Sequence, residues 1–314
     1  MENNKLSYQG KGEELFGILI VNFFLTLITL GFYYPWAKVK KLKYVYGSTE
    51  FSGNRFEFHG TGQEMFIGMI KAVAIFIVLY VILLLTITKG PILASLGTII
   101  YVLGFLTLIP IAIHGALKYR LSRSSWRGIY FGYRGNLVEL FKVYFKGFGL
   151  TIITLGIYGS WFAVDLRKYV FKYIRFGSVR FSFNGDGGTL FIICLKGFLL
   201  SIVTLGIYLF WYLKARFNFM VENTTIEHNG KSYPIKSNAT GLGILKLELV
   251  NILLLIITLG LAYSWVLTRE LRYFMSNIEV PAEFDSGSIS QTEEGFSDAT
   301  GSNLLDFLDF GLIF

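Results

Sequence analysis

The residues that could do chemistry in this chain are few, and most lie inside or beside long apolar runs. Asn22 and Asn251 each lie seven residues before a repeated threonine, His114 follows Pro-Ile-Ala-Ile, and Lys146 and Lys196 lie near the starts of apolar runs. Amide, imidazole and ammonium groups in apolar surroundings can line a solute pathway or relay protons. The simpler explanation is structural: the amides join helices, the histidine ends a helix, and the lysines reach an interface.

Other kinds of site have little material. The chain has one cysteine, Cys194, and three scattered histidines, so a disulfide framework is impossible and a metal site is poorly supplied. No glycine-rich phosphate loop, zinc-ligand spacing or Ser/His/Asp arrangement occurs. We therefore expect no enzyme activity, no catalytic residues, no cofactor and no metal.

Composition favours a membrane protein. Of the 314 residues, 53% are apolar and 16% charged, whereas soluble domains usually have about 45–50% apolar and about 25% charged residues. Residues 279–314 contain eight acids and no Lys or Arg, so the rest of the chain has a net charge of +16. Such an excess fits cytoplasmic loops and anionic lipid headgroups better than nucleic acid.

The same phrase occurs four times: Thr-Leu-Gly, with Trp five positions after the glycine. Each copy closes an apolar run and precedes Lys or Arg, a pattern typical of membrane segments. The glycine could break a helix within the bilayer and expose carbonyls, or it could pack closely against a second helix. The four copies contain Thr29, Gly31, Trp36, Thr154, Gly156, Trp161, Thr204, Gly206, Trp211, Thr258, Gly260 and Trp265.

A second pattern lies fifteen residues before each threonine and begins at Glu14, Glu139, Thr189 and Gly243, and a fifth start at Glu64 opens an atypical unit. That unit predicts a transmembrane hairpin, with arms 66–86 and 92–117 long enough to cross a bilayer. The sequence therefore predicts an all-α polytopic membrane protein built from internal repeats. Its units are 1–62, 63–135, 136–186, 187–240 and 241–278, followed by an acidic tail, 279–314.

Short strands are expected between the helical units. Alternating apolar and polar residues bounded by Gly and Asn occur at 53–60, 126–133, 179–185 and 224–234, and Asn229-Gly230 is a candidate hairpin turn. Between each Trp and each strand, the apolar and basic positions suit an interfacial amphipathic helix.

The charges of the loops conflict with a simple topology of six membrane spans. Loops 37–55, 118–134 and 162–180 each contain five Lys or Arg, and loop 212–236 contains four. If all six apolar segments span, these loops alternate sides, against the positive-inside rule. If the Thr-Leu-Gly segments re-enter instead, only the hairpin of the second unit spans. The stretches 146–161 and 196–211 are about 24 Å long as helices, short of the roughly 30 Å core. Six spans is the simpler reading, with some lysines reaching the interface.

The tail combines two kinds of sequence. Residues 281–303 are rich in Ser, Gly, Thr and acids, which predicts disorder. Residues 304–314 form an amphipathic segment of acidic and apolar residues, and an apolar terminus left in water is an aggregation liability. We expect this segment to dock on the basic surface, on another subunit or on a partner protein.

The stretch from Asn22 to Lys38, together with the Phe-x-Phe-x-Gly strands, resembles the YjgN family of bacterial inner-membrane proteins, over roughly residues 8–275. The resemblance implies a multi-pass protein of the bacterial inner membrane with no established activity, so it supplies no catalytic residues. The acidic tail departs from the family, as does Leu261-Ala262 where other copies of the motif have Ile-Tyr.

Two functions fit these observations. The first is a transport or channel-like body for a small solute or ion, in which Asn22, Asn251 or His114 surround a cavity. The alternative is a lipid-binding scaffold that recruits a partner through the acidic tail. We expect anionic lipids as partners, and a homo-oligomer is compatible with the repeats.

Overall fold

The computed structural model describes residues 4–292. Within them, ten helices form five antiparallel hairpins, and the second helix of each hairpin leads into a strand. The residues before the first helices of four hairpins cap those helices, because their side chains accept hydrogen bonds from backbone N–H groups of the first turn: Thr61, Asn136, Asp186 and Thr240. The helices are α1 (Gly12–Ile28), α2 (Tyr34–Ser48), α3 (Gly62–Ile87), α4 (Pro91–Ser122), α5 (Leu137–Ile153), α6 (Gly159–Tyr173), α7 (Gly187–Val203), α8 (Leu209–Glu222), α9 (Gly241–Ile257) and α10 (Tyr263–Ser276).

The strands join into one antiparallel sheet of nine strands in sequence order, which differs from the isolated hairpins expected in an all-α fold. The predicted turn at Asn229-Gly230 is confirmed, with positive φ at both residues. The strands are β1 (Leu6–Tyr8), β2 (Thr49–Phe51), β3 (Asn54–Phe58), β4 (Ser124–Trp126), β5 (Ile129–Tyr133), β6 (Ile174–Phe176), β7 (Val179–Phe183), β8 (Thr224–His228) and β9 (Lys231–Pro234), with β10 (Lys236–Ser237) and β11 (Ile278–Glu279) as a separate pair.

The helices pack in a closed circuit, because each helix contacts the next and α10 contacts α1. Trp265 of α10 packs on Gly12 so closely that a Cβ there would lie 2.3 Å from the indole ring. Trp36 packs in the same way on Gly62, at the start of the following hairpin. Arg272 completes the closure by donating hydrogen bonds to the carbonyls of Tyr8 and Gly10.

A second core lies at the centre of the sheet. Trp126 is fully buried there, and its Nε1 donates to the carbonyls of Phe51 and Asn54, both at 3.1 Å. Phe284 and Ile289, beyond the last strand, are also buried in this core. The prediction of disorder is therefore wrong for residues 281–292, because these apolar side chains anchor the segment. Residues 293–303 and the predicted docking segment 304–314 lie outside the described residues.

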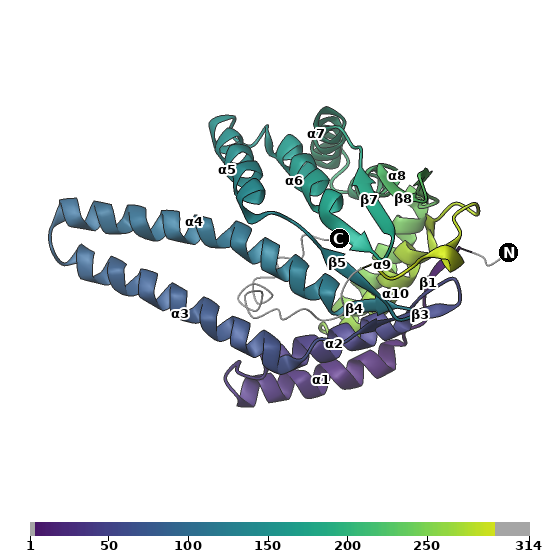
Figure 1. Ribbon diagram of the computed structural model, residues 1–314, viewed down its shortest axis with the longest axis horizontal. Helices are drawn as coiled ribbons and strands as arrows, with labels where there is room; N and C mark the ends of the chain where they lie inside the picture. The colour runs from purple at the N-terminus through teal and green to yellow at the C-terminus, as the bar shows by residue number, and fades with distance from the viewer. Residues whose placement is uncertain (1–3, 293–314) are drawn as a thin grey trace.

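The hairpins do not alternate in direction, as six alternating spans would require. Each of the first four hairpins leaves the nine-stranded sheet with its first helix and returns to it with its second, so the four basic loops lie on one side of the molecule; α9–α10 runs in the same way from β10 to β11. The sheet lies at one end, and the α3–α4 hairpin extends furthest from it (Figure 1). By length and composition, α3 and α4 are the two helices within residues 4–292 that could cross a membrane.

Candidate functional site

The four Thr-Leu-Gly phrases form the same turn between the two helices of a hairpin. In the α5–α6 turn, the Thr154 hydroxyl donates to the Leu150 carbonyl at 2.7 Å and accepts from the Tyr158 N–H at 2.9 Å. The threonine thus satisfies the end of one helix and the start of the next. The threonines of the other three turns, Thr29, Thr204 and Thr258, make the same pair of bonds.

The glycine of the phrase has a conformational role. Gly156 has φ of +95°, and a Cβ added to it would meet nothing within 4 Å. The prediction that Gly31, Gly156, Gly206 and Gly260 pack closely against another helix is therefore wrong. They also lie between helices and break none of them. Each is preceded by a leucine with φ near +50°, a conformation that disfavours residues with a Cβ.

The tips of these turns are apolar and exposed. Leu30, Leu155, Leu205 and Leu259 are between 89% and 95% exposed, and the isoleucine or valine that ends each first helix is about three-quarters exposed. Contiguous exposed apolar surface of this kind marks a site of contact with a membrane or with another protein.

Exposed lysines lie at equivalent positions along three first helices. Lys71, Lys146 and Lys196 are each nine residues after the start of α3, α5 and α7, and all are exposed. Lys146 and Lys196 therefore take no part in an internal cavity. Because nine residues of helix rise about 14 Å, the three lysines lie equally far along their helices, and we call this position the lysine level.

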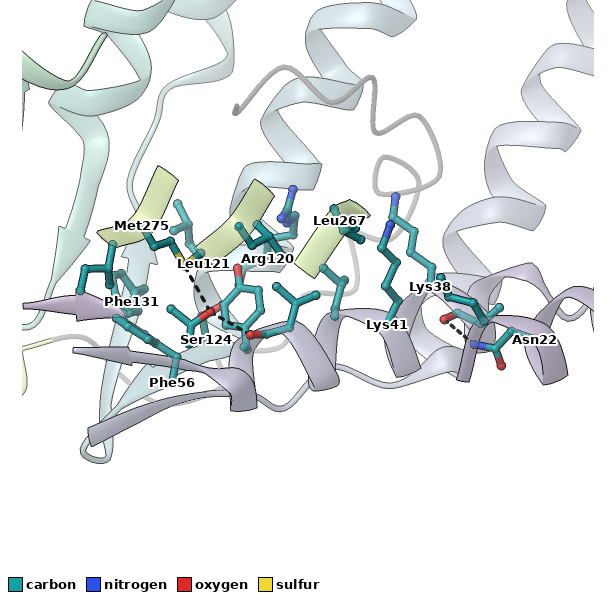
Figure 2. Close-up of a pocket in the computed structure, with 18 of the residues that line it drawn as sticks. Asn22, Lys38, Lys41, Phe56, Arg120, Leu121, Ser124, Phe131, Leu267 and Met275 are labelled. Carbon is teal, nitrogen blue, oxygen red and sulfur yellow. Dashed lines mark hydrogen bonds between the residues drawn. The ribbon is translucent and has the colours of Figure 1, made fainter. Parts of the chain in front are cut away.

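A cavity of about 670 Å³ lies between α1, α2, α4, α10 and the strands. Figure 2 shows Lys38 and Lys41 of α2 and Arg120 of α4 around it, with their charged ends pointing the same way. Apolar side chains make up much of the rest of the wall, including Leu19, Phe56, Phe131, Leu267 and Leu271.

The two candidate asparagines occupy equivalent places with different surroundings. Asn22 lines the cavity, and its Nδ2 donates to the Ala37 carbonyl at 3.2 Å, while its Oδ1 has no partner among the described residues. Asn251 is buried outside the cavity lining and accepts a hydrogen bond from Arg269 Nε at 3.1 Å. Both amides thus join the two arms of a hairpin, and Asn22 alone of the pair faces the cavity.

His114 also lies away from the cavity. Its ring contacts Tyr133 at 5.3 Å between centroids, and its Nδ1 is buried without a partner in the described chain. Each repeated Trp lies thirteen residues before the following strand, and that position in α4 is Ile111. Ile111, and not His114, therefore takes the place of the repeated tryptophan in the long hairpin.

Several structurally important polar residues carry no signal in the motifs above. Arg123 is buried and pairs with Glu64 at 2.7 Å, closing the base of the α3–α4 hairpin. A tyrosine closes the base of four hairpins by a hydroxyl contact to the residue before the first helix, as Tyr169 does with Asn136 at 2.6 Å. The other three tyrosines are Tyr44, Tyr119 and Tyr273. Three of these tyrosines lie 33 residues after the residue that they contact, and in the long α3–α4 hairpin the separation is 58 residues. This regular spacing could have revealed them in the sequence.

Burial also perturbs charged groups outside the cavity. Arg167 stacks on Phe171 and Phe183, its Nε has no hydrogen-bond partner in the described region, and burial lowers its pKa to about 10, with Arg216 adding to the effect. Burial raises the pKa of Glu270, and the nearby Glu248 raises it further.

Together these features define a class of protein: five helical hairpins standing on one side of an antiparallel sheet, with exposed apolar tips and a basic, partly apolar cavity near their base. Within residues 4–292 no cluster of His, Cys, Asp and Glu suits a metal ion. The chain belongs to the family described as bacterial protein of unknown function (DUF898), whose model matches residues 3–186, 178–246 and 212–307.

The relatives confirm the resemblance to YjgN proteins. The chain is 34% identical over 132 residues to the inner membrane protein YjgN of Salmonella typhimurium, covering 42% of this chain and 32% of that protein. It is 32% identical over 138 residues to the protein of the same name from Escherichia coli K12, covering 44% and 33%. The chain thus matches about a third of the length of these relatives. No solved structure matches the chain.

Proposed function

We propose that this protein is inserted into the bacterial inner membrane from one face, with α3–α4 crossing the bilayer and the four shorter hairpins entering halfway. The observation that carries the proposal is the set of exposed leucine tips, each at the end of a hairpin whose two helices connect paired strands. The relatives named inner membrane proteins support this location. The five hairpins also support the predicted five-unit organisation.

The lysine level gives the depth of insertion. From Lys71 to Lys89, at the far turn of α3–α4, is eighteen residues, or about 27 Å of helix, close to the roughly 30 Å apolar core of a bilayer. From Lys146 to Leu155, and from Lys196 to Leu205, is nine residues, or about 14 Å. If these lysines lie at the headgroups, the short hairpins reach the middle of the bilayer.

The loop charges set the orientation. The four basic loops lie together at the sheet, and positively charged loops stay in the cytoplasm. The sheet and its central core therefore face the cytoplasm, and the turn at Lys89 faces the periplasm. In this arrangement every basic loop obeys the positive-inside rule.

We further propose that the cavity binds an amphiphile with an anionic, phosphate-bearing head, such as phosphatidylglycerol. Lys38, Lys41 and Arg120 supply positive charge, and the Leu and Phe side chains supply apolar contact for acyl chains. This is the lipid-binding alternative predicted from the sequence, placed at a defined cavity.

Binding of fluorescent phosphatidylglycerol to the detergent-purified protein tests this site. At about 1 kcal/mol for each cation near anionic lipid, the Lys38→Gln/Lys41→Gln/Arg120→Gln variant should bind on the order of 100-fold more weakly. The matched control is Lys43→Gln, on the same helix but exposed and outside the cavity lining. Equal loss in the control, or no loss in the triple variant, would reject the site.

Transport of a small solute or ion is the second candidate, favoured by the position of Asn22 beside two lysines in the cavity wall. Against it, Asn251 and His114 lie outside that wall. A flux assay in proteoliposomes separates the two, because lipid binding predicts no solute flux. The partner protein of the tail and the homo-oligomer stay predictions.

A further inference from the structure

The cavity and the last eleven residues of the chain have complementary chemistry. The cavity wall combines three cations with leucines and phenylalanines. Residues 304–314, Leu-Leu-Asp-Phe-Leu-Asp-Phe-Gly-Leu-Ile-Phe, combine two carboxylates with apolar side chains and contain no base. An amphiphilic anion is the ligand class proposed for the cavity, and this segment belongs to the same class.

The described chain ends close to the cavity. Ile289 is buried in the central core, Gln291 accepts a hydrogen bond from the Tyr130 N–H at 2.8 Å, and the Thr292 hydroxyl donates to the Gly177 carbonyl at 2.5 Å. The residue after Tyr130 is Phe131, which lines the cavity. The last described residues are thus hydrogen-bonded to β5 at the residue next to one that lines the cavity.

The remaining chain is long enough to enter. Twenty-two residues, 293–314, follow Thr292, and fully extended they could span up to about 70 Å. A segment tethered at this distance has an effective concentration in the millimolar range. Modest intrinsic affinity is then enough to occupy the cavity.

We propose that residues 304–314 bind in the cavity between α1, α2, α4 and α10 and compete there with anionic lipid. The lipid site is then regulated by the chain's own terminus, and release of the tail frees the cavity and the tail together. This inference rests on the proposed lipid-binding function.

Cross-linking tests occupancy by the tail without reference to lipid. In a Cys194→Ala background, the Lys41→Cys/Asp309→Cys protein should cross-link with a short bismaleimide within one molecule, as judged by its mobility in denaturing gels. Lys43→Cys/Asp309→Cys, with its first cysteine on the exposed side of α2, should cross-link far less. Equal yields from the two pairs, or none from the first, would overturn the proposal.

Lipid affinity tests the competition. The chain ending at Thr292 and the full-length Asp306→Asn/Asp309→Asn variant should both bind fluorescent phosphatidylglycerol at least tenfold more tightly than the wild type. The double variant keeps the full chain, so it controls for misfolding of the truncated protein. Unchanged affinity in both would overturn the competition. Absence of lipid binding in every protein, with the Lys41 cross-link intact, would reject the lipid function while leaving tail occupancy standing.

Discussion

Arg123 and Glu64 hold the base of the long hairpin through an ion pair that is mostly removed from water. Glu64 also exchanges two hydrogen bonds with Thr61 at the start of α3. Removing one member of a buried pair leaves the other charge uncompensated.

Replacement of Arg123 tests how much this ion pair contributes to stability. Arg123→Met should lower the free energy of unfolding by about 3 kcal/mol, measured by thermal or denaturant unfolding in detergent. The exposed pair of Lys172 with Glu139 at 3.1 Å is the control, and Glu139→Gln should cost under about 1 kcal/mol. An equal loss of unfolding free energy in the two variants would mean that the buried ion pair contributes no more to stability than the exposed one.

Glu270 gives a prediction for pH. Because its pKa is raised in the folded protein, the folded state binds more protons than the unfolded chain above the ordinary Glu pKa of about 4.3. The free energy of unfolding therefore falls as pH rises through that window. Glu270→Gln should be more stable than the wild type at pH 7, with the difference shrinking toward pH 4. A difference independent of pH would contradict the assignment.

At the scale of the elements, the Thr-Leu-Gly turn depends on a left-handed glycine. Gly156→Ala should cost about 1–2 kcal/mol, because alanine resists positive φ. Gly149, inside α5 with open space around it, is the matched control, and Gly149→Ala should be neutral or stabilising by about 1 kcal/mol. Comparable unfolding midpoints for the two variants would contradict the role of the turn.

The sequence predicted the elements well because their signals are local. The predicted starts at Glu14, Glu64 and Glu139 each fall two residues after the observed first residue of the helix, and the interfacial helices and strands follow from periodicity. The role of the Thr-Leu-Gly glycine was not predicted correctly, because the same residues can occur where a glycine packs against a helix and where it forms a turn. Only the backbone angles separate the two.

At the scale of the whole molecule, the long-range contacts could not be read from the sequence. The cavity needs α1 beside α10, and that closure depends on Trp265 meeting Gly12 across the length of the chain. Nothing near Lys38 or Arg120 in the sequence indicates that they share a cavity. The buried asparagines were found from their spacing, but which of them faces the cavity depended on packing.

The sheet also resolves the contradiction between the motifs and the loop charges. Four similar phrases with the same basic flanks cannot point both ways through a bilayer without breaking the positive-inside rule. In the structure each phrase is the tip of a returning hairpin, so all four point away from the basic loops.

Cysteine accessibility in spheroplasts tests insertion from one face most directly. Single cysteines replace exposed residues of the basic side (Glu57, Arg127, Arg180 and Ser232), the far turn (Lys89) and two tips (Leu155 and Leu205), all in a Cys194→Ala background. We predict that an impermeant maleimide labels position 89 in intact spheroplasts. It should label the four basic-side positions only after permeabilisation, and the two tips only in detergent. Labelling of position 127 or 180 in intact spheroplasts, with 57 and 232 protected, would contradict this prediction.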